Sequence, residues 1–216
     1  MIACSRDCTA ELERRVAQAW KAFYKHSALL QCRAIPVGRR LETLRKLVLP
    51  ALVYNLGTCH LTSKQLLRLR GVEDKMARRV LRWRLPRNTA IDPSTDTADY
   101  MAISAVRLQR IRAWYGWKRW DEEALYCAYK WAGHVVRLTA RAPQRLVGQA
   151  LLYRGSEYLQ RVKSLYGHQG HASRFHVWWW EQMFTSWRGI DWKSCALQGE
   201  VWEDSANSWL RGRVQQ

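Results

Sequence analysis

The chain has 216 residues, 48% of them hydrophobic, which is enough material for one ordinary domain or two small ones with a buried core. Its 36 Lys and Arg residues against 18 Asp and Glu residues give a formal net charge of +18, so polyanions are the expected partners. The longest uninterrupted apolar stretch, residues 47–54, is far shorter than the roughly 20 residues of a membrane span, which argues against a membrane partner.

The positive charge is concentrated at the front of the chain. Residues 1–90 carry 19 basic and 6 acidic side chains, whereas residues 91–216 carry 17 and 12. We therefore expect the first part of the chain to contact a polyanion.

The six cysteines are scattered without the spacing of a disulfide framework, and no apolar signal segment follows Met1. We expect reduced thiols in an intracellular protein, nuclear or cytoplasmic, without a signal peptide or a transmembrane segment.

Two helices are predicted before residue 60. Thr9 is a plausible N-cap for the first, whose apolar side chains lie on one helical stripe: Leu12, Val16, Ala19, Trp20, Phe23 and Leu30. Pro36 and Gly38 end it, and a second, buried helix begins at about Arg39. Pro50 lies inside this second segment and predicts a kink or a break there.

A third helix is predicted from Thr62, which forms a capping box with Gln65, to about Arg84. Consecutive residues of an α-helix are rotated by about 100°, so six cations project within an arc of roughly 100° opposite the apolar stripe of this helix. These candidate nucleic-acid-binding residues are Lys64, Arg68, Lys75, Arg78, Arg79 and Arg82. Lys and Arg on one helical face can follow nucleic-acid phosphates, although the same pattern also fits a merely solvated face.

Residues 87–97 are rich in turn formers and predict a linker between a basic unit at 1–86 and a Trp-rich unit at 98–216. Further helices are expected over residues 98–119, from Asp121 to about Val136, after Pro143, and in two Trp-rich segments of the tail, the second capped by Asp191. No strand alternation occurs, so the predicted fold class is all-α.

No metal or catalytic site is predicted. Cys4 and Cys8 lack partners at zinc-ligand spacing, and the same holds for the histidines His168, His171 and His176. The acidic run from Asp121 to Glu123 lies at a helix start, where carboxylates stabilise the helix dipole. The sequence contains neither a Gly-rich phosphate loop nor paired aspartates that would hold two metal ions, so no cofactor is expected.

The tryptophans have two interpretations. Trp114, Trp117, Trp120 and the run Trp178–Trp180 could stack unpaired bases, as in single-strand binders, or they could pack in a core or against a missing domain.

The order of several segments resembles the C-terminal part of LINE-type (non-LTR) retrotransposon polyproteins, beyond the reverse transcriptase palm. The resemblance runs from about Ala19 to Trp202 and includes "IPVGRRLETLRKLVLPALVYNLGTCHLT", "KQLLRLRGVEDKMARRVLRW", "KWAGHVVRL" and "DWKSCALQGEVW". It implies a helical thumb that contacts the template–primer duplex, followed by a Trp-rich helical extension.

Two family motifs carry the resemblance. The first reads P-x-L-L-Y-G and then Trp; it matches Pro50, Leu52, Val53 and Tyr54, but the chain has Asn55 in place of Gly and Cys59 in place of Trp. The second, "W-A-G-H", matches at Trp131, Ala132, Gly133 and His134. Pro50, Tyr54, Trp131, Gly133 and His134 are therefore expected to be structural.

The family's polymerase activity depends on palm aspartates, and this sequence contains no Asp-Asp pair. The resemblance thus implies a non-catalytic fragment that binds RNA, DNA or their hybrid. Two alternatives stay open: an interaction module that docks on a reverse transcriptase palm or another partner, and a truncated element remnant without selected activity.

Overall fold

The computed structural model describes residues 8–59, 61–81, 97–141, 143–145, 149, 184, 187 and 192–214. Within these ranges the chain forms α-helices and one 3-10 helix, with no strand, so the predicted all-α class is confirmed. The chain forms two compact units, Met1–Leu125 and Tyr126–Gln216. This division falls later than the predicted linker at 87–97, which, apart from Thr97, lies outside the described residues.

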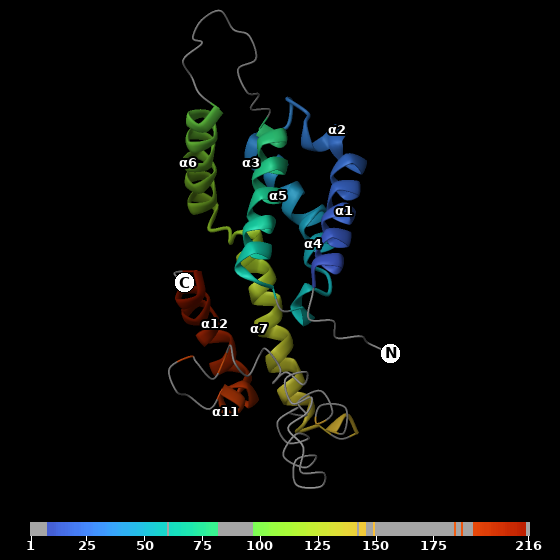
Figure 1. Cartoon of the computed structure of the whole chain (residues 1–216), viewed down its shortest axis with the longest axis vertical. Coiled ribbons are helices and arrows are strands. Elements are labelled where there is room, and N and C mark those ends of the chain that lie inside the picture. Colours follow the sequence, from blue (N-terminus) through green and yellow to red (C-terminus); the bar gives the residue numbers. More distant parts are fainter. Residues whose placement is uncertain are drawn as a thin grey trace, which may run out of the picture. The chain divides into compact units, whose positions relative to one another are not determined.

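The first unit contains the following elements in chain order: α1 (Thr9–Lys25), α2 (Ser27–Leu30), α3 (Val37–Leu47), α4 (Leu49–Val53), the 3-10 helix η1 (Leu56–Thr58), α5 (Ser63–Leu81) and α6 (Thr97–Tyr115). Helix α7 (Trp120–Leu138) begins in this unit and ends in the second. Helix α1 packs on α4 and α5, α3 packs on α4 and α5, and α6 packs on α5 (Figure 1).

The core of the first unit is built from the predicted stripes. On α1, Leu12, Val16, Ala19 and Phe23 recur at helical spacing and are all buried, whereas Trp20 is half-buried. The predicted first helix is divided at His26, so the buried Leu30 lies on α2. The buried side chains of α1 meet those of the other helices, which include Leu41, Leu44, Leu52, Leu69, Val72, Met76, Val80, Leu108 and Trp120. Burial of such side chains contributes about 1.5–3 kcal/mol each, which makes this cluster the main source of stability.

Pro50 separates α3 from α4. Helix α3 ends at Leu47, and Pro50 lies in the first turn of α4, where a missing N–H costs no intrahelical hydrogen bond. The predicted interruption is therefore a break between two helices.

A tight turn follows α4. Tyr54 has φ −53° and ψ 125°, and Asn55 has φ 64° and ψ −3°, which are the dihedral angles of a type II turn. Such a turn needs a positive φ at its third residue, a conformation that Gly and Asn adopt most easily. Asn55 therefore fits the position at which the resembling family has glycine.

Three predicted helix ends are corrected. Helix α6 ends at Tyr115 instead of Arg119 because Gly116, at φ 62°, adopts a left-handed conformation, and Trp117 N–H donates to the Arg112 carbonyl in a Schellman motif. Helix α1 has Cys8, not Thr9, at its N-cap. Helix α7 begins at Trp120, so Asp121 lies within its first turn.

The second unit is built around aromatic rings. Its described elements are the larger part of α7 with α11 (Trp192–Leu197) and α12 (Gly199–Val214), so the predicted single C-terminal helix is in fact two, divided at Gln198. Tyr129, Phe184, Trp192, Trp202 and Trp209 are all buried and contact one another at centroid distances from 4.0 to 6.1 Å. These five rings form a buried aromatic core. Asp191 lies outside the described residues.

Candidate nucleic-acid interface

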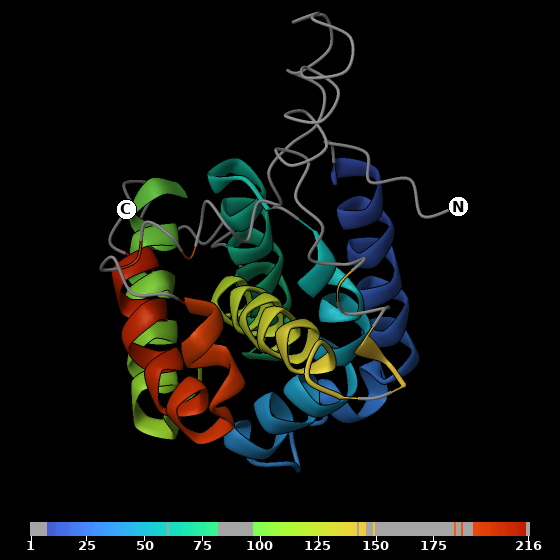
Figure 2. The same ribbon diagram turned by 90° about the horizontal axis from the view of Figure 1, so that it is seen from below.

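Helix α5, which carries the predicted cations, lies between α1 and α6 (Figures 1 and 2). Its start is fixed by the predicted capping box: Gln65 N–H donates to Thr62 Oγ1 at 3.3 Å, and Thr62 N–H donates to Gln65 Oε1 at 2.8 Å. Gln65 Nε2 also donates to Thr9 Oγ1 at 3.1 Å, which ties the first turns of α5 and α1 together.

One side of α5 is buried in the core, and the opposite side faces solvent. Leu69, Val72, Met76, Ala77 and Val80 are buried. Lys64 and Lys75 are exposed on the other side, and Arg78 is half-buried there. None of these three cations makes an ion pair among the described residues. Arg82, the last member of the predicted set, lies outside the described residues.

Two of the predicted cations contact α1. The Arg68 guanidinium pairs with the Glu13 carboxylate at 3.0 and 3.1 Å, and both side chains are nearly half exposed. Arg79 lies 5.0 Å from the Trp20 ring centroid and donates to the Tyr24 hydroxyl. Helix α1 therefore runs along one edge of the predicted cationic face, and this could not be deduced from the periodicity of α5 alone.

The carboxylates of the first unit are already engaged. Each described carboxylate side chain in this unit makes an ion pair or accepts a backbone hydrogen bond: Glu11, Glu13, Glu42, Glu73, Asp74, Asp121, Glu122 and Glu123. Hydrogen bonds from the neighbouring guanidinium groups lower the pKa of Glu11 and of Glu13, which keeps both charged at neutral pH.

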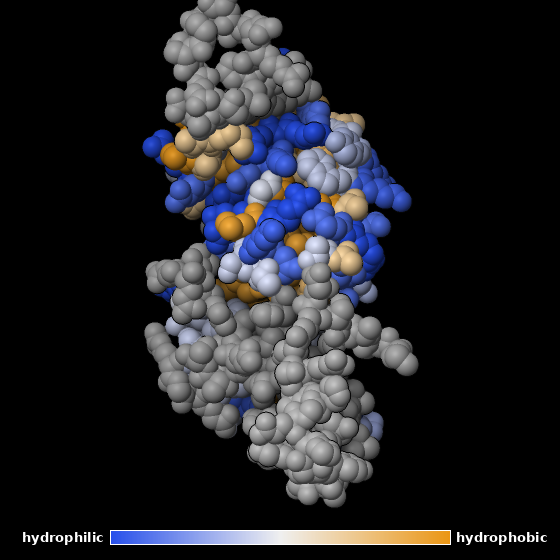
Figure 3. All heavy atoms as spheres, in the orientation of Figure 1, coloured by the Kyte–Doolittle hydropathy of each residue, from blue (hydrophilic) through white to orange (hydrophobic). Residues whose placement is uncertain are grey.

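The cations outnumber these carboxylates. On α1 and α5, the cations without an acidic partner among the described residues are Lys21, Lys25, Lys64, Lys75, Arg78 and Arg79. Figure 3 shows that hydrophilic residues predominate over this part of the first unit. The exposed sides of α1 and α5 therefore carry a concentration of positive charge, and no described carboxylate of this unit is left to neutralise it.

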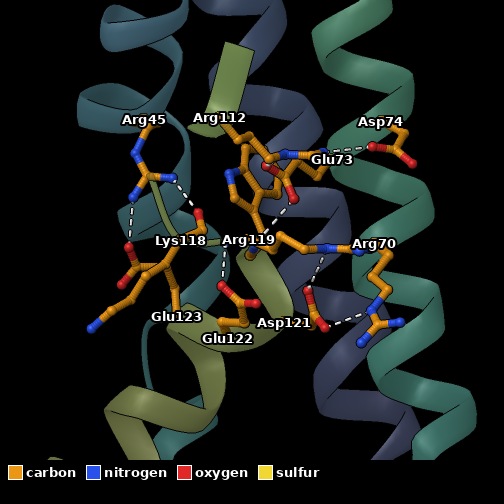
Figure 4. Close-up of polar contacts among 11 residues, drawn as sticks. Arg45, Arg70, Glu73, Asp74, Arg112, Lys118, Arg119, Asp121, Glu122 and Glu123 are labelled. Carbon is orange, nitrogen blue, oxygen red and sulfur yellow. Dashed lines mark hydrogen bonds and ion pairs between the residues drawn. The ribbon is translucent and has the colours of Figure 1, made fainter. Parts of the chain in front are cut away.

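A buried ionic cluster holds α5 in place from its other side (Figure 4). Glu73 accepts from Arg112 of α6 at 3.1 Å and from the Trp120 N–H at the start of α7 at 3.0 Å. Asp74 accepts from the same Arg112 at 2.7 Å. Burial raises the pKa of Glu73 even though Arg112 and the Trp120 N–H favour its charged form. One carboxylate thus connects α5, α6 and α7.

The acidic run of α7 completes this cluster. Asp121 pairs with Arg70 of α5 at 2.6 Å, and Glu123 pairs with Arg45 of α3. Glu122 accepts from the Arg119 N–H at 2.9 Å, which satisfies one of the free donors at the helix start. The predicted capping role is observed, and in addition two of the three carboxylates attach α7 to neighbouring helices.

A cavity of about 20 Å³ lies in the first unit, lined in part by Arg45, Glu73, Arg112 and Trp117, and has room for roughly one water molecule. No group of potential metal ligands is found among the described residues. Cys4, His168, His171 and His176 lie outside them, so the sequence-based expectation stands there as a prediction.

The other aromatic candidates have different environments. Trp114 is 85% exposed, Trp117 is half-buried and stacks on Tyr115, and Trp120 is buried in the core. Trp178 to Trp180 lie outside the described residues. Tyr24 was not among the predicted interface residues, although its position off the core stripe of α1 was an available signal.

The residues of the second family motif occupy two sides of α7. Gly133 is buried against Trp202, whereas His134 is exposed and stacks on the half-buried Trp131 with ring centroids 5.6 Å apart. In the first motif, Tyr54 is exposed and lies under the Arg15 guanidinium at 4.5 Å.

No protein-family model matches the chain, and neither the curated proteins nor the solved structures give a match. Among the described residues, no helix combines the length and apolar character needed to cross a bilayer.

Proposed function

We propose that this chain binds nucleic acid without catalysing a reaction, through the exposed cationic side of α5 and the adjoining cations of α1. The ligand is the phosphate backbone of RNA, DNA or an RNA/DNA hybrid, contacted without regard to sequence. The proposal places the chain inside the cell, in the nucleus or the cytoplasm.

One observation carries the proposal. Lys64, Lys75 and Arg78 lie on one side of a long helix without acidic partners, while the described carboxylates of the same unit are already engaged. An ordinary solvated helix face mixes both signs of charge. Backbone phosphates would supply the missing negative charges, and each contact would release condensed counterions.

The resemblance to retrotransposon thumb and extension sequences supports a template–primer duplex as the ligand. The absence of an Asp-Asp pair from the sequence supports a non-catalytic role. A primer-extension assay tests this part: metal-dependent DNA synthesis by the purified chain would contradict it.

The main test is the salt dependence of binding to an RNA/DNA hybrid. Replacement of Lys64, Lys75 and Arg78 by Ala should weaken binding and reduce the slope of log K against log salt by about 0.9 for each phosphate that the variant no longer neutralises. The matched control replaces Arg14, Arg39 and Lys46 by Ala. It removes the same charge, but these three residues pair with acids on their own helices. An equal effect in both variants, or a flat salt response of the wild type, would refute the proposal.

A second candidate function is docking on a protein partner, such as a reverse transcriptase palm. It is favoured by apolar side chains exposed on α6, namely Ile103, Val106 and Trp114. Co-expression with a palm fragment tests it: we expect copurification with the wild type but not with a variant in which Val106 and Trp114 become Ser. A chain that stays monomeric and retains no palm fragment would exclude this candidate.

A further inference from the structure

An aromatic pair, formed by the half-buried Trp20 and the exposed Tyr24, lies at the edge where α1 meets α5. The Trp20 and Tyr24 rings stack with centroids 5.8 Å apart and an interplanar angle of 28°. Both rings also contact the buried Phe23 edge-on, at 5.5 and 5.7 Å. The pair is therefore anchored in the core, yet Tyr24 remains 54% exposed.

A guanidinium group fixes the orientation of this pair. Arg79 of α5 lies 5.0 Å from the Trp20 centroid and 5.8 Å from the Tyr24 centroid, and it donates to the Tyr24 hydroxyl. Cation–π contact and a hydrogen bond thus stabilise this orientation of the exposed ring. A ring that is already ordered loses little conformational entropy when a ligand stacks on it.

The surrounding charges suit a polyanion. Lys21 and Lys25 flank Tyr24 on α1, and Lys75 and Arg78 are near Arg79 along α5. Glu13, the carboxylate on the α5-facing side of α1, is already paired with Arg68. An apolar partner would have to desolvate these cations, whereas a nucleotide supplies both a flat π-face and a phosphate.

We propose that Tyr24, supported by Trp20 and Arg79, is a stacking platform for one unpaired base, with the adjacent phosphates held by the neighbouring lysines. This inference rests on the proposed nucleic-acid-binding function and specifies it: the preferred ligand is a duplex that continues into a single strand. Stacking on an aromatic side chain tolerates every base, so the platform has no sequence preference.

The test compares a blunt RNA/DNA hybrid with the same hybrid carrying a single-stranded extension. The wild type should bind the extended hybrid at least about fivefold more tightly, the ratio that corresponds to the weaker end of base–aromatic stacking. Tyr24→Leu should remove this preference, whereas Tyr24→Phe should keep it because the ring remains. Tyr54→Leu, which removes another exposed tyrosine that contacts a guanidinium group, is the matched control and should also keep it.

A second readout separates stacking from a structural role. A 2-aminopurine base at the junction should lose fluorescence on binding to the wild type and to Tyr24→Phe, but not to Tyr24→Leu. Preserved preference and quenching in Tyr24→Leu, or equal loss in Tyr54→Leu, would overturn the platform. Failure of the wild type to bind even the blunt hybrid would instead refute the proposed function itself.

Discussion

The indole of Trp202 lies directly against Gly133: a methyl group on this glycine would be 2.3 Å from the indole Nε1 and 2.7 Å from Cδ1. The same indole stacks on Tyr129, with ring centroids 4.0 Å apart. Trp202 Nε1 donates to the Tyr129 carbonyl at 3.3 Å, and the Tyr129 hydroxyl donates to the Trp202 carbonyl at 2.7 Å. Helices α7 and α12 are thus joined by one pair of side chains that bind each other's backbone.

Gly133→Ala should destabilise the second unit. Alanine is the better helix former by about 1 kcal/mol, but its methyl group would displace a side chain that is only 1% exposed. Overpacking of this kind typically costs about 1–3 kcal/mol, so we expect a net loss of stability in denaturant unfolding followed by tryptophan fluorescence.

Gly71→Ala is the matched control for this substitution. Gly71 lies within α5, where an added methyl group meets no atom within 4 Å. The variant should gain about 0.5–1 kcal/mol from helix propensity alone. Equal effects of the two substitutions would show that Trp202 does not pack against Gly133.

Glu13→Gln should strengthen binding to an RNA/DNA hybrid. The substitution releases Arg68 from its ion pair and adds a free cation to the exposed side of α5. The salt slope should become steeper by up to about 0.9, at a stability cost of about 0.2–1 kcal/mol because the pair is largely solvated. Glu42→Gln, which releases Arg39 and Lys46 on α3, should change the slope less. Binding that is unchanged or weaker would contradict an interface on α5.

The contribution of Glu73 to the stability of the folded chain should fall as the pH rises. Its pKa in the folded state is raised above the ordinary value of 4.5 by burial, so just above pH 4.5 the folded chain holds a proton that the unfolded chain has lost. Stability from this group is therefore greatest below 4.5 and falls as the pH rises through the folded pKa. Glu73→Gln cannot ionise, and its stability relative to the wild type should increase from pH 4.5 to neutrality.

The contribution of Glu42 to stability should depend on pH in the opposite direction, so Glu42→Gln serves as a comparison. Hydrogen bonds from Lys46 and Arg39 lower the pKa of Glu42, so its contribution is lost as the pH falls. Chemical denaturation of both variants across this pH range checks the prediction. A constant difference between Glu73→Gln and the wild type would show that burial does not raise the pKa of Glu73.

Cys59 should resist alkylation in the folded chain. Burial, with a contribution from the neighbouring Cys8, raises the pKa of its thiol to about 12. The reactive thiolate would then be about one molecule in ten thousand at pH 8. Mass spectrometry after iodoacetamide treatment should find Cys59 unmodified while the half-buried Cys32 reacts, and unfolding should make both reactive. Rapid native labelling of Cys59 would contradict the burial.

The helical class and most of the core stripes were determined by the sequence alone, whereas the breaks at His26 and Gln198 were not. Apolar spacing identified the buried side chains of α1 and α5, and Thr62 and Gln65 marked the start of α5, because periodicity and capping act within one helix. Pro50 likewise indicated the break between α3 and α4. The end of α6 at Tyr115 was not predicted, because it depends on the left-handed conformation of a single residue, Gly116, and not on the apolar spacing of the helix.

Which cations remain available was decided by the tertiary structure. By their helical spacing, Arg68 and Arg79 project from the same side of α5 as Lys64 and Lys75. However, the two arginines are contacted by α1, which brings Glu13, Trp20 and Tyr24 against them from about 55 residues earlier in the chain. The motif spacing around Gly133 likewise gives no sign of Trp202, which packs against it from a distant helix. Periodicity tells which side of a helix is polar, but only the packing of a second helix determines which charges on that side are neutralised and which remain free to bind.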